Sequence, residues 1–126
     1  MTERKRLVAV IVEVADLSRS ARLYREGFGL DLKPGDNRVD DRWIGGEHAE
    51  ISWVEGAYLH FALYQAKEKP TTRVQLAFVV DDLDEAHSAA VRAGAEVVHE
   101  ERDQPWGRGA RYRDFDGNVI ELTQRP

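Results

Sequence analysis

The chain has 126 residues, and 42% of them are hydrophobic. This length and composition suit one folded domain with one core, or two small halves that share a core. There are no cysteines, which excludes disulfides, cysteine-ligated zinc and a thiol nucleophile. The formal net charge is −5, with 18 basic and 23 acidic residues, and this balance argues against a nucleic-acid partner, whose phosphates require a basic surface.

No stretch of the chain resembles a signal peptide or a membrane-spanning helix. The longest apolar run near the start, LVAVIV at residues 7–12, is far too short to cross a bilayer. The basic cluster ERKR at residues 3–6 is expected to be a solvated tail. We therefore expect a soluble cytoplasmic protein without a membrane partner.

The first half of the chain predicts a strand, a helix and further strands. Residues 7–14 are rich in β-branched residues and predict a strand, and residues 15–29 predict a helix that an Asp or Ser caps and two glycines end. Residues 30–36 predict a short strand with a turn at its Pro-Gly pair. Residues 41–56 predict irregular β structure, and residues 57–65 predict a strong strand.

The pattern restarts after a polar segment. Residues 66–72 (AKEKPTT) contain a proline and lack periodicity, so they are predicted to link module one, residues 7–65, to module two, residues 73–124. Residues 74–98 again predict strand, acidic turn, helix and strand, and residues 107–124 predict two strands around the turn DFDGN. The packed face of the second helix is predicted to carry Leu83, Ala86, Ala90 and Val91.

An internal repeat underlies this pattern. VADL at residues 14–17 matches VDDL at residues 80–83, which is an offset of 66 positions. Each half then has the element order β-α-β-β-β. The offset pairs Ala9 with Gln75, and alignment of YLHFAL with VIELT pairs His60 with Glu121.

Alternation along the strands separates a bulky apolar face, suited to packing on a helix, from a smaller and more polar face. Glu121 lies between Ile120 and Leu122, where a bare buried carboxylate costs several kcal/mol, roughly, unless it is paired, protonated or bound to a metal. If the polar faces line one hollow, a ligand site is expected there. If they face water, they need no function. The polar faces carry His60, Tyr64, Gln75, Glu121 and Thr123.

The doubled βαβββ pattern, with VADLSRSARLYREGFGLDL at residues 14–32 and RDFDGNVIEL at residues 113–122, resembles the glyoxalase, bleomycin-resistance and dioxygenase superfamily, also called vicinal oxygen chelate proteins. The resemblance covers nearly the whole chain. It implies an α+β fold in which two βαβββ modules form a curved mixed sheet around a cavity. It also implies a homodimer, with many cavities built from both chains.

The resemblance implies four strand positions for metal ligands, which here carry Ala9, His60, Gln75 and Glu121. Ala9 cannot ligate a metal, and of the dioxygenase ligand set only Glu121 remains, so a dioxygenase is not expected. No cofactor is favoured. A divalent metal such as Ni, Zn, Fe or Mn, if bound, would use His60, Gln75 and Glu121.

A second resemblance concerns residues 104–118 (QPWGRGARYRDFDGN), which are similar to the PWGR strand and turn of bleomycin-resistance proteins. Those relatives are non-catalytic dimers that sequester a drug in grooves between chains, partly by aromatic stacking. The resemblance implies a stacking role for Trp106, and Trp43 falls roughly where another groove aromatic would lie.

Three functional hypotheses remain. The first is a metal-free homodimeric protein that binds a planar or cationic compound such as an antibiotic, through Trp43, His60, Tyr64, Gln75, Trp106 and Glu121. The second is a divalent-metal-dependent lyase or isomerase of glyoxalase type. The third is a metal-free enzyme in which His60 or Glu121 acts as general acid-base. Without a metal, Glu121 is expected to line a ligand cavity, with its charge balanced by His60 or by a bound cationic ligand.

Overall fold

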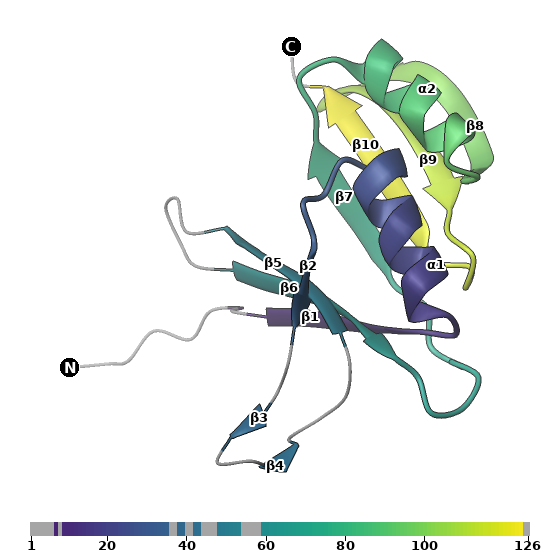
Figure 1. Ribbon diagram of the computed structural model, residues 1–126. Helices are drawn as coiled ribbons and strands as arrows, with labels where there is room; N and C mark the ends of the chain where they lie inside the picture. Colours follow the sequence, from purple (N-terminus) through teal and green to yellow (C-terminus); the bar gives the residue numbers. More distant parts are fainter. Residues whose placement is uncertain are drawn as a thin grey trace.

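The computed structural model describes residues 7, 9–35, 38–39, 42–43, 48–53 and 59–124, and at residues 38–39 and 42–43 it describes the backbone alone. Within these ranges the chain forms two four-stranded sheets, a two-stranded ladder and few helices, so the predicted α+β fold is confirmed. Figure 1 shows the two sheets set at an angle to each other, with both helices on one side of the molecule. No helix in the described ranges is long and apolar enough to span a membrane.

Sheet one consists of β1 (Ala9–Val14), β2 (Lys33–Gly35), β5 (His48–Trp53) and β6 (Leu59–Gln65), in the spatial order β1-β6-β5-β2. Strand β1 runs parallel to β6, whereas β6 and β5, and β5 and β2, are antiparallel. The short strands β3 (Arg38–Val39) and β4 (Arg42–Trp43) pair with each other as a separate ladder.

Sheet two repeats this topology. It consists of β7 (Gln75–Val79), β8 (Glu96–Gln104), β9 (Gly107–Arg113) and β10 (Val119–Gln124), in the order β7-β10-β9-β8. Its first strand runs parallel to its last, and the other two pairs are antiparallel. The internal repeat in the sequence therefore corresponds to two sheets of the same connectivity.

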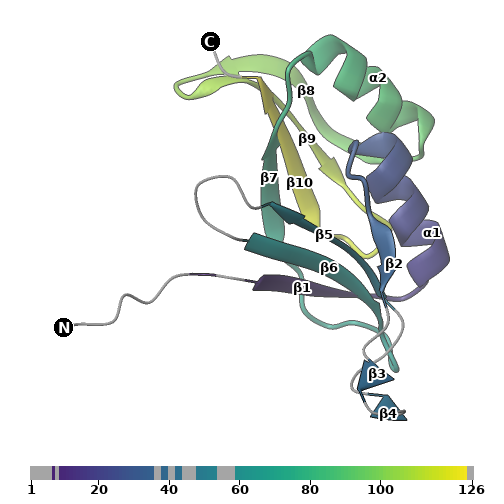
Figure 2. The same cartoon turned by 60° about the vertical axis from the view of Figure 1, so that its left-hand side comes forward.

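One helix follows the first strand of each sheet. In module one, α1 (Leu17–Arg22) continues directly into a π-helical turn, η1 (Leu23–Gly27), and in module two α2 (Leu83–Arg92) is regular. Strands β8, β9 and β10 and the turn η1 all contact α2. Figures 1 and 2 place the two helices next to each other, while β1, β5 and β6 extend away from them.

The repeat motif supplies the helix caps. The Asp16 carboxylate accepts a hydrogen bond from the Arg19 N–H at 3.1 Å, and Asp82 accepts one from the Glu85 N–H at 3.2 Å. A second cap comes from the closing strand of each sheet. The side-chain oxygen of Gln65 accepts from the first helical N–H of α1 at 2.9 Å, and that of Gln124 accepts from the first N–H of α2 at 2.7 Å.

The apolar faces of both sheets meet in one core. Phe78 of sheet two contacts Phe61 of sheet one with ring centroids 6.1 Å apart, and Trp53 of sheet one with centroids 6.4 Å apart. Phe28, just after η1, reaches Tyr112 of β9 at 6.0 Å. The halves therefore share one hydrophobic cluster.

The turn DFDGN joins the two halves. The Tyr24 hydroxyl donates a 2.6 Å hydrogen bond to Asp114, which also accepts from the side chain and backbone of Asn118. The Ala15 N–H donates to Asp116 at 3.0 Å. Burial, with the negative charge of Asp114, raises the pKa of Tyr24 far above its ordinary value, so the phenol remains a donor. Both carboxylates of this motif are therefore structural.

Two local predictions were wrong. Pro34 and Gly35 lie inside β2 rather than in a turn. Because β2 is an edge strand, a proline without an N–H is tolerated there. Val91 is 49% exposed and lies off the packed face of α2, whereas Leu83 and Ala90 are fully buried. Ala90 follows Leu83 by about two helical turns, whereas Val91 lies one residue further along and about 100° round the helix from Ala90.

Candidate functional site

Each sheet has a polar face opposite its apolar face, which we call its open face. Because the apolar faces of the two sheets meet in the core, the two open faces of one chain point away from each other. Ala9 lies opposite His60 on sheet one, while Gln75 and Glu121 share the open face of sheet two, opposite Val119 and Ala77 respectively. One chain thus brings the four predicted ligand positions together in two pairs, but not in one hollow.

His60 belongs to a polar cluster on the open face of sheet one. Its Nδ1 lies 2.8 Å from the Ser52 hydroxyl, and its Nε2 lies 3.3 Å from Glu50 Oε2. A carboxylate only accepts hydrogen bonds, so the Glu50 contact favours a proton on Nε2 and leaves Nδ1 to accept from Ser52. This arrangement orients the imidazole and makes Nδ1 its hydrogen-bond acceptor.

The same Glu50 oxygen binds a second histidine. His48 Nε2 lies 2.8 Å from Glu50 Oε2, and the His48 ring stacks on Tyr64 with centroids 4.5 Å apart and planes 8° apart. His48 is only 3% exposed. Gly35 lies opposite His48 in the β2–β5 ladder, and a Cβ there would overlap the imidazole. The predicted site residue Tyr64 therefore supports this cluster by packing on His48.

Sequence reasoning missed His48, Glu50 and Ser52. The signal was present, because the three alternate with apolar residues in HAEISW and so share one strand face. What the alternation alone does not reveal is that β5 lies beside β6, with Ser52 directly opposite His60.

Glu121 occupies the matching strand of sheet two and is 9% exposed. Arg111 Nε donates to its carboxylate at 3.2 Å, and the Thr123 hydroxyl donates at 3.2 Å. Burial alone raises the pKa of Glu121, but these hydrogen bonds and the positive charge of Arg111 outweigh it, and the pKa is lowered below its ordinary value. The carboxylate is therefore ionised and paired.

We expected His60 to balance the negative charge of Glu121. Within one chain, Arg111 does so instead. Arg111 lies directly opposite Glu121 in the β9–β10 ladder, which explains the pairing. Sequence reasoning missed Arg111, although alternation in GARYR places it on the same face as Gly109 and Arg113.

Gln75 lies exposed at the start of β7 and lines a hollow of about 490 Å³ together with Arg73 and Arg113. Trp106 lies in the two-residue turn between β8 and β9 and is 54% exposed. Trp43 ends β4, and its side chain falls outside the described residues.

The predicted metal ligands do not fit one ion within a single chain. His60 bonds to Ser52 and Glu50, and Glu121 bonds to a cation that competes with any metal. In the part of the chain that the structure describes, no three His, Asp or Glu side chains are arranged to hold a metal ion.

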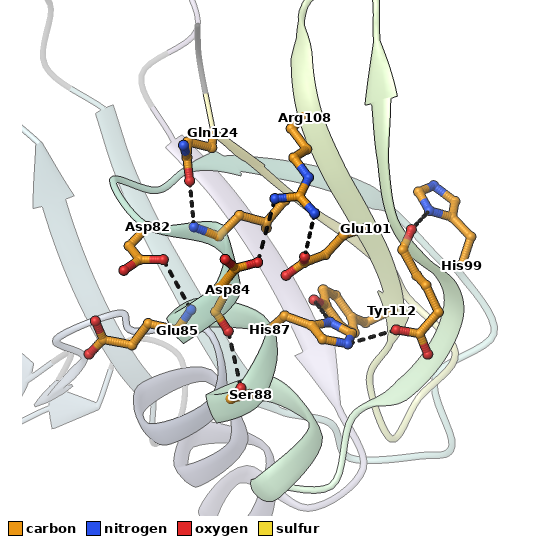
Figure 3. A network of polar contacts seen from close by, with 12 residues as sticks. Asp82, Asp84, Glu85, His87, Ser88, His99, Glu101, Arg108, Tyr112 and Gln124 are labelled. Carbon is orange, nitrogen blue, oxygen red and sulfur yellow. Dashed lines mark hydrogen bonds and ion pairs between the residues drawn. The ribbon is translucent and has the colours of Figure 1, made fainter.

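A further polar network lies on the helix side of sheet two (Figure 3). His87 of α2 contacts the Tyr112 hydroxyl at 2.6 Å and Glu100 at 2.8 Å, and Arg108 binds Glu101 at 2.9 Å. Burial, followed by the charges of Glu101 and Glu100, raises the pKa of Tyr112 well above its ordinary value. This network fastens α2 to β8 and β9 rather than lining an open face.

Comparisons with known proteins agree with this fold. A family model described as "Glyoxalase-like domain" matches residues 9–123. The crystal structure of TnmS3, an antibiotic binding protein from Streptomyces sp. CB03234, is similar with a TM-score of 0.74 and 26% identity, over 100% of both chains. A glyoxalase/bleomycin resistance protein from Streptomyces sp. CB03234 is similar with a TM-score of 0.68 and 27% identity, over 94% of this chain and 100% of that chain.

Similarity also extends to a curated relative of nearly the same length. The uncharacterized protein YetH of Bacillus subtilis (strain 168) is 24% identical over 127 residues, which cover 95% of this chain and 98% of YetH. The family model spans almost the whole chain, including both sheets and both helices. The chain therefore belongs to the glyoxalase-like domain family.

Proposed function

We propose that the protein binds a planar or cationic small molecule, such as an antibiotic, in a cavity that two copies of the chain form together. The observation that carries this proposal is Trp106, a large aromatic side chain that is more than half exposed at a two-residue turn beside sheet two. An exposed indole offers a flat stacking surface, and stacking adds about 0.5–1.5 kcal/mol beyond the burial of its area.

The likeness to TnmS3 supports the binding role, because that protein is an antibiotic binding protein and the similarity spans both chains completely. A binding role also accounts for a site in which Glu121 is already neutralised by Arg111. A stacked ligand needs no reactive carboxylate.

The arrangement of the open faces supports a dimer. Strands β1 and β7 are edge strands, each paired on one side only among the described strands. Their open faces carry Ile11, which is 58% exposed, and Val79, which is 56% exposed. A second copy that set its β7 beside β1 would cover these side chains and bring one open face of each chain into a common cavity.

The test combines oligomeric state with fluorescence. In a Trp43→Phe, Trp53→Phe background, Trp106 is the remaining tryptophan, and titration with bleomycin or with the planar cation ethidium is expected to quench its emission. Trp106→Ala in the otherwise unchanged protein is expected to weaken binding about tenfold by calorimetry. A monomer by analytical ultracentrifugation, or affinity unchanged in Trp106→Ala, contradicts the proposal.

A second candidate function rests on the Ser52–His60–Glu50 contacts. An imidazole that Glu50 orients through Nε2 is suited to accept a proton at Nδ1 from an enolisable ketone, without metal, when the substrate takes the place of the Ser52 hydroxyl. Exchange of the α-protons of dihydroxyacetone in D₂O, followed by NMR, tests this role. Exchange that the protein accelerates and that His60→Asn abolishes is expected, whereas equal exchange with both proteins excludes it.

A further inference from the structure

A cleft of about 840 Å³ opens between the two sheets on their apolar side. Strands β5 and β6 line it from sheet one and β7 lines it from sheet two, and residues of α2 and of the turn after η1 line it as well. Its size lies within the range of about 300–1,000 Å³ that is usual for small-molecule sites. His60, Gln75, Trp106 and Glu121 do not line it, although Val79 at the edge of β7 does, so the cleft is a different place from the site described above.

The walls of the cleft are aromatic and incompletely covered. Trp53 and Phe78 contact each other across the sheets and remain half-buried, and Phe61 lies edge-on to Phe78 with planes 82° apart. Ile51 and Leu59 are also half-buried at this boundary. Apart from Phe61, which is buried, these side chains present apolar surface that a ligand in the cleft would remove from water.

The charged residues that line the cleft are all acidic, and the described lining residues include no Lys, Arg or His. Two of them have basic neighbours, since Arg22 binds Glu26 at 3.1 Å and Lys33 binds Asp31 at 3.1 Å. The other lining carboxylates are Asp81, Asp82 and Glu85.

These three carboxylates lie at the start of α2 and are exposed. Asp82 caps the helix by accepting from the Glu85 N–H. Figure 3 shows the Glu85 carboxylate pointing away from Arg108, whose ion pairs are with Asp84 and Glu101. This end of the cleft therefore carries negative charge that the neighbouring arginine does not neutralise.

We propose that this inter-sheet cleft binds an amphiphilic cation, a compound with an aromatic or otherwise apolar body and one positive charge. The body lies in the cleft against the half-buried rings of Trp53 and Phe78, whose faces also attract a cation. The charge lies toward Asp81 and Glu85. An anion of the same shape is repelled by the same rim, which makes the sign of the ligand charge the defining property of the site.

The test uses two rigid ions of nearly the same size and apolar surface, tetraphenylphosphonium and tetraphenylborate. Calorimetry on the full chain is expected to show tetraphenylphosphonium binding at least tenfold more tightly, and raising NaCl from 50 to 500 mM is expected to weaken it. The double variant Asp81→Asn, Glu85→Gln is expected to raise its Kd about fivefold to tenfold and to reduce the preference over tetraphenylborate. The helix cap is kept in this variant, because Asp82 is unchanged and accepts from the backbone N–H of residue 85.

A matched control removes the same charge elsewhere. Glu68→Gln, Asp103→Asn changes two exposed carboxylates outside the cleft, so the Kd is expected to stay within twofold of the unchanged protein. Equal affinity for the two ions, or equal weakening by both double variants, overturns the proposal.

The test also separates this site from the open-face cavity. Trp106→Ala is expected to leave tetraphenylphosphonium binding unchanged, whatever it does to bleomycin or ethidium. If Trp106→Ala abolishes tetraphenylphosphonium binding instead, the cation occupies the open face and the inter-sheet site is wrong while the proposed function stands. If Asp81→Asn, Glu85→Gln alters dimer dissociation and not ligand affinity, a second copy covers the cleft and the proposal is again wrong.

Discussion

His60 and Glu121 occupy equivalent positions in the two halves of this molecule, yet their surroundings differ. The His60 side chain is 23% exposed and contacts Ser52 and Glu50, a carboxylate that remains 37% exposed. The Glu121 side chain is 12% exposed and is held by Arg111 and by Thr123. The His60 position thus keeps an imidazole near solvent, whereas the Glu121 position encloses a carboxylate whose charge Arg111 already neutralises.

The difference teaches that the two halves share their framework but not their chemistry. Asp16 and Asp82 cap the two helices in the same way, and Gln65 and Gln124 add the same second cap. Framework contacts of this kind are needed in both halves for the sheets to fold. The open faces carry no such requirement, so one became a histidine cluster and the other an ion pair.

The largest expected effect comes from breaking the ion pair between Arg111 and Glu121. Arg111→Met leaves Glu121 buried without its cation, and we expect the free energy of unfolding to fall by about 2 kcal/mol. Loss of a partner from a fully buried pair costs about 3–5 kcal/mol, but Arg111 is 37% exposed, and solvent screening reduces the effect. Urea denaturation at pH 7 measures it.

Arg113→Met is the matched control for this change. Arg113 lies two residues away on the same strand face, and its side chain is 46% exposed with a 3.8 Å contact to Glu96. We expect a loss of less than about 0.5 kcal/mol, as for an ordinary surface ion pair. Equal losses for the two arginines would show that Glu121 gains no special stabilisation and would remove the contrast with His60.

A smaller effect concerns the stability of the protein at low pH. The pKa of Glu121 is lower in the folded protein than its ordinary value of 4.5, so the ion pair contributes fully above the unfolded pKa and its contribution is lost as pH falls through the folded pKa. The stability difference between the unchanged protein and Arg111→Met is therefore expected to shrink between pH 7 and pH 3. Carboxyl NMR is expected to show the pKa of Glu121 rising in Arg111→Met, because burial remains when the cation is gone.

A stability difference that is the same at pH 7 and pH 3 would contradict this account. It would assign the effect of Arg111→Met to the packing of the arginine side chain rather than to its charge.

The sequence predicted the framework well because the framework depends on local signals. Asp caps, the alternation of apolar residues and the 66-residue repeat are each contained in a short stretch of chain, and the α+β fold follows from them. Alternation also separated the apolar strand faces from the polar ones correctly, since Phe61, Leu63, Ile120 and Leu122 on the apolar faces are buried.

The partners of the site residues were not predictable in the same way. Glu50 and Ser52 reach His60, and Arg111 reaches Glu121, through the order and register of neighbouring strands rather than through sequence spacing. The turn carboxylates Asp114 and Asp116 also bind Tyr24 and Ala15, about 90 to 100 residues away, and no local pattern indicates these two contacts. Site residues were thus predicted where the alternation within one strand identified the polar face. Their partners were missed because these depend on which strand lies alongside.

The smallest expected effect comes from the cluster of His48, Glu50 and His60 on sheet one. It tests the comparison of His60 with Glu121 from the His60 side. Glu50→Gln removes the charge between His48 and His60 but keeps a carbonyl oxygen that accepts from both imidazoles. Because Glu50 is 37% exposed, we expect the free energy of unfolding to change by less than about 1 kcal/mol in urea denaturation. A loss as large as that of Arg111→Met would mean that this cluster supports the fold as strongly as the Glu121 pair does, and a role for His60 in binding or proton transfer would lose its structural basis.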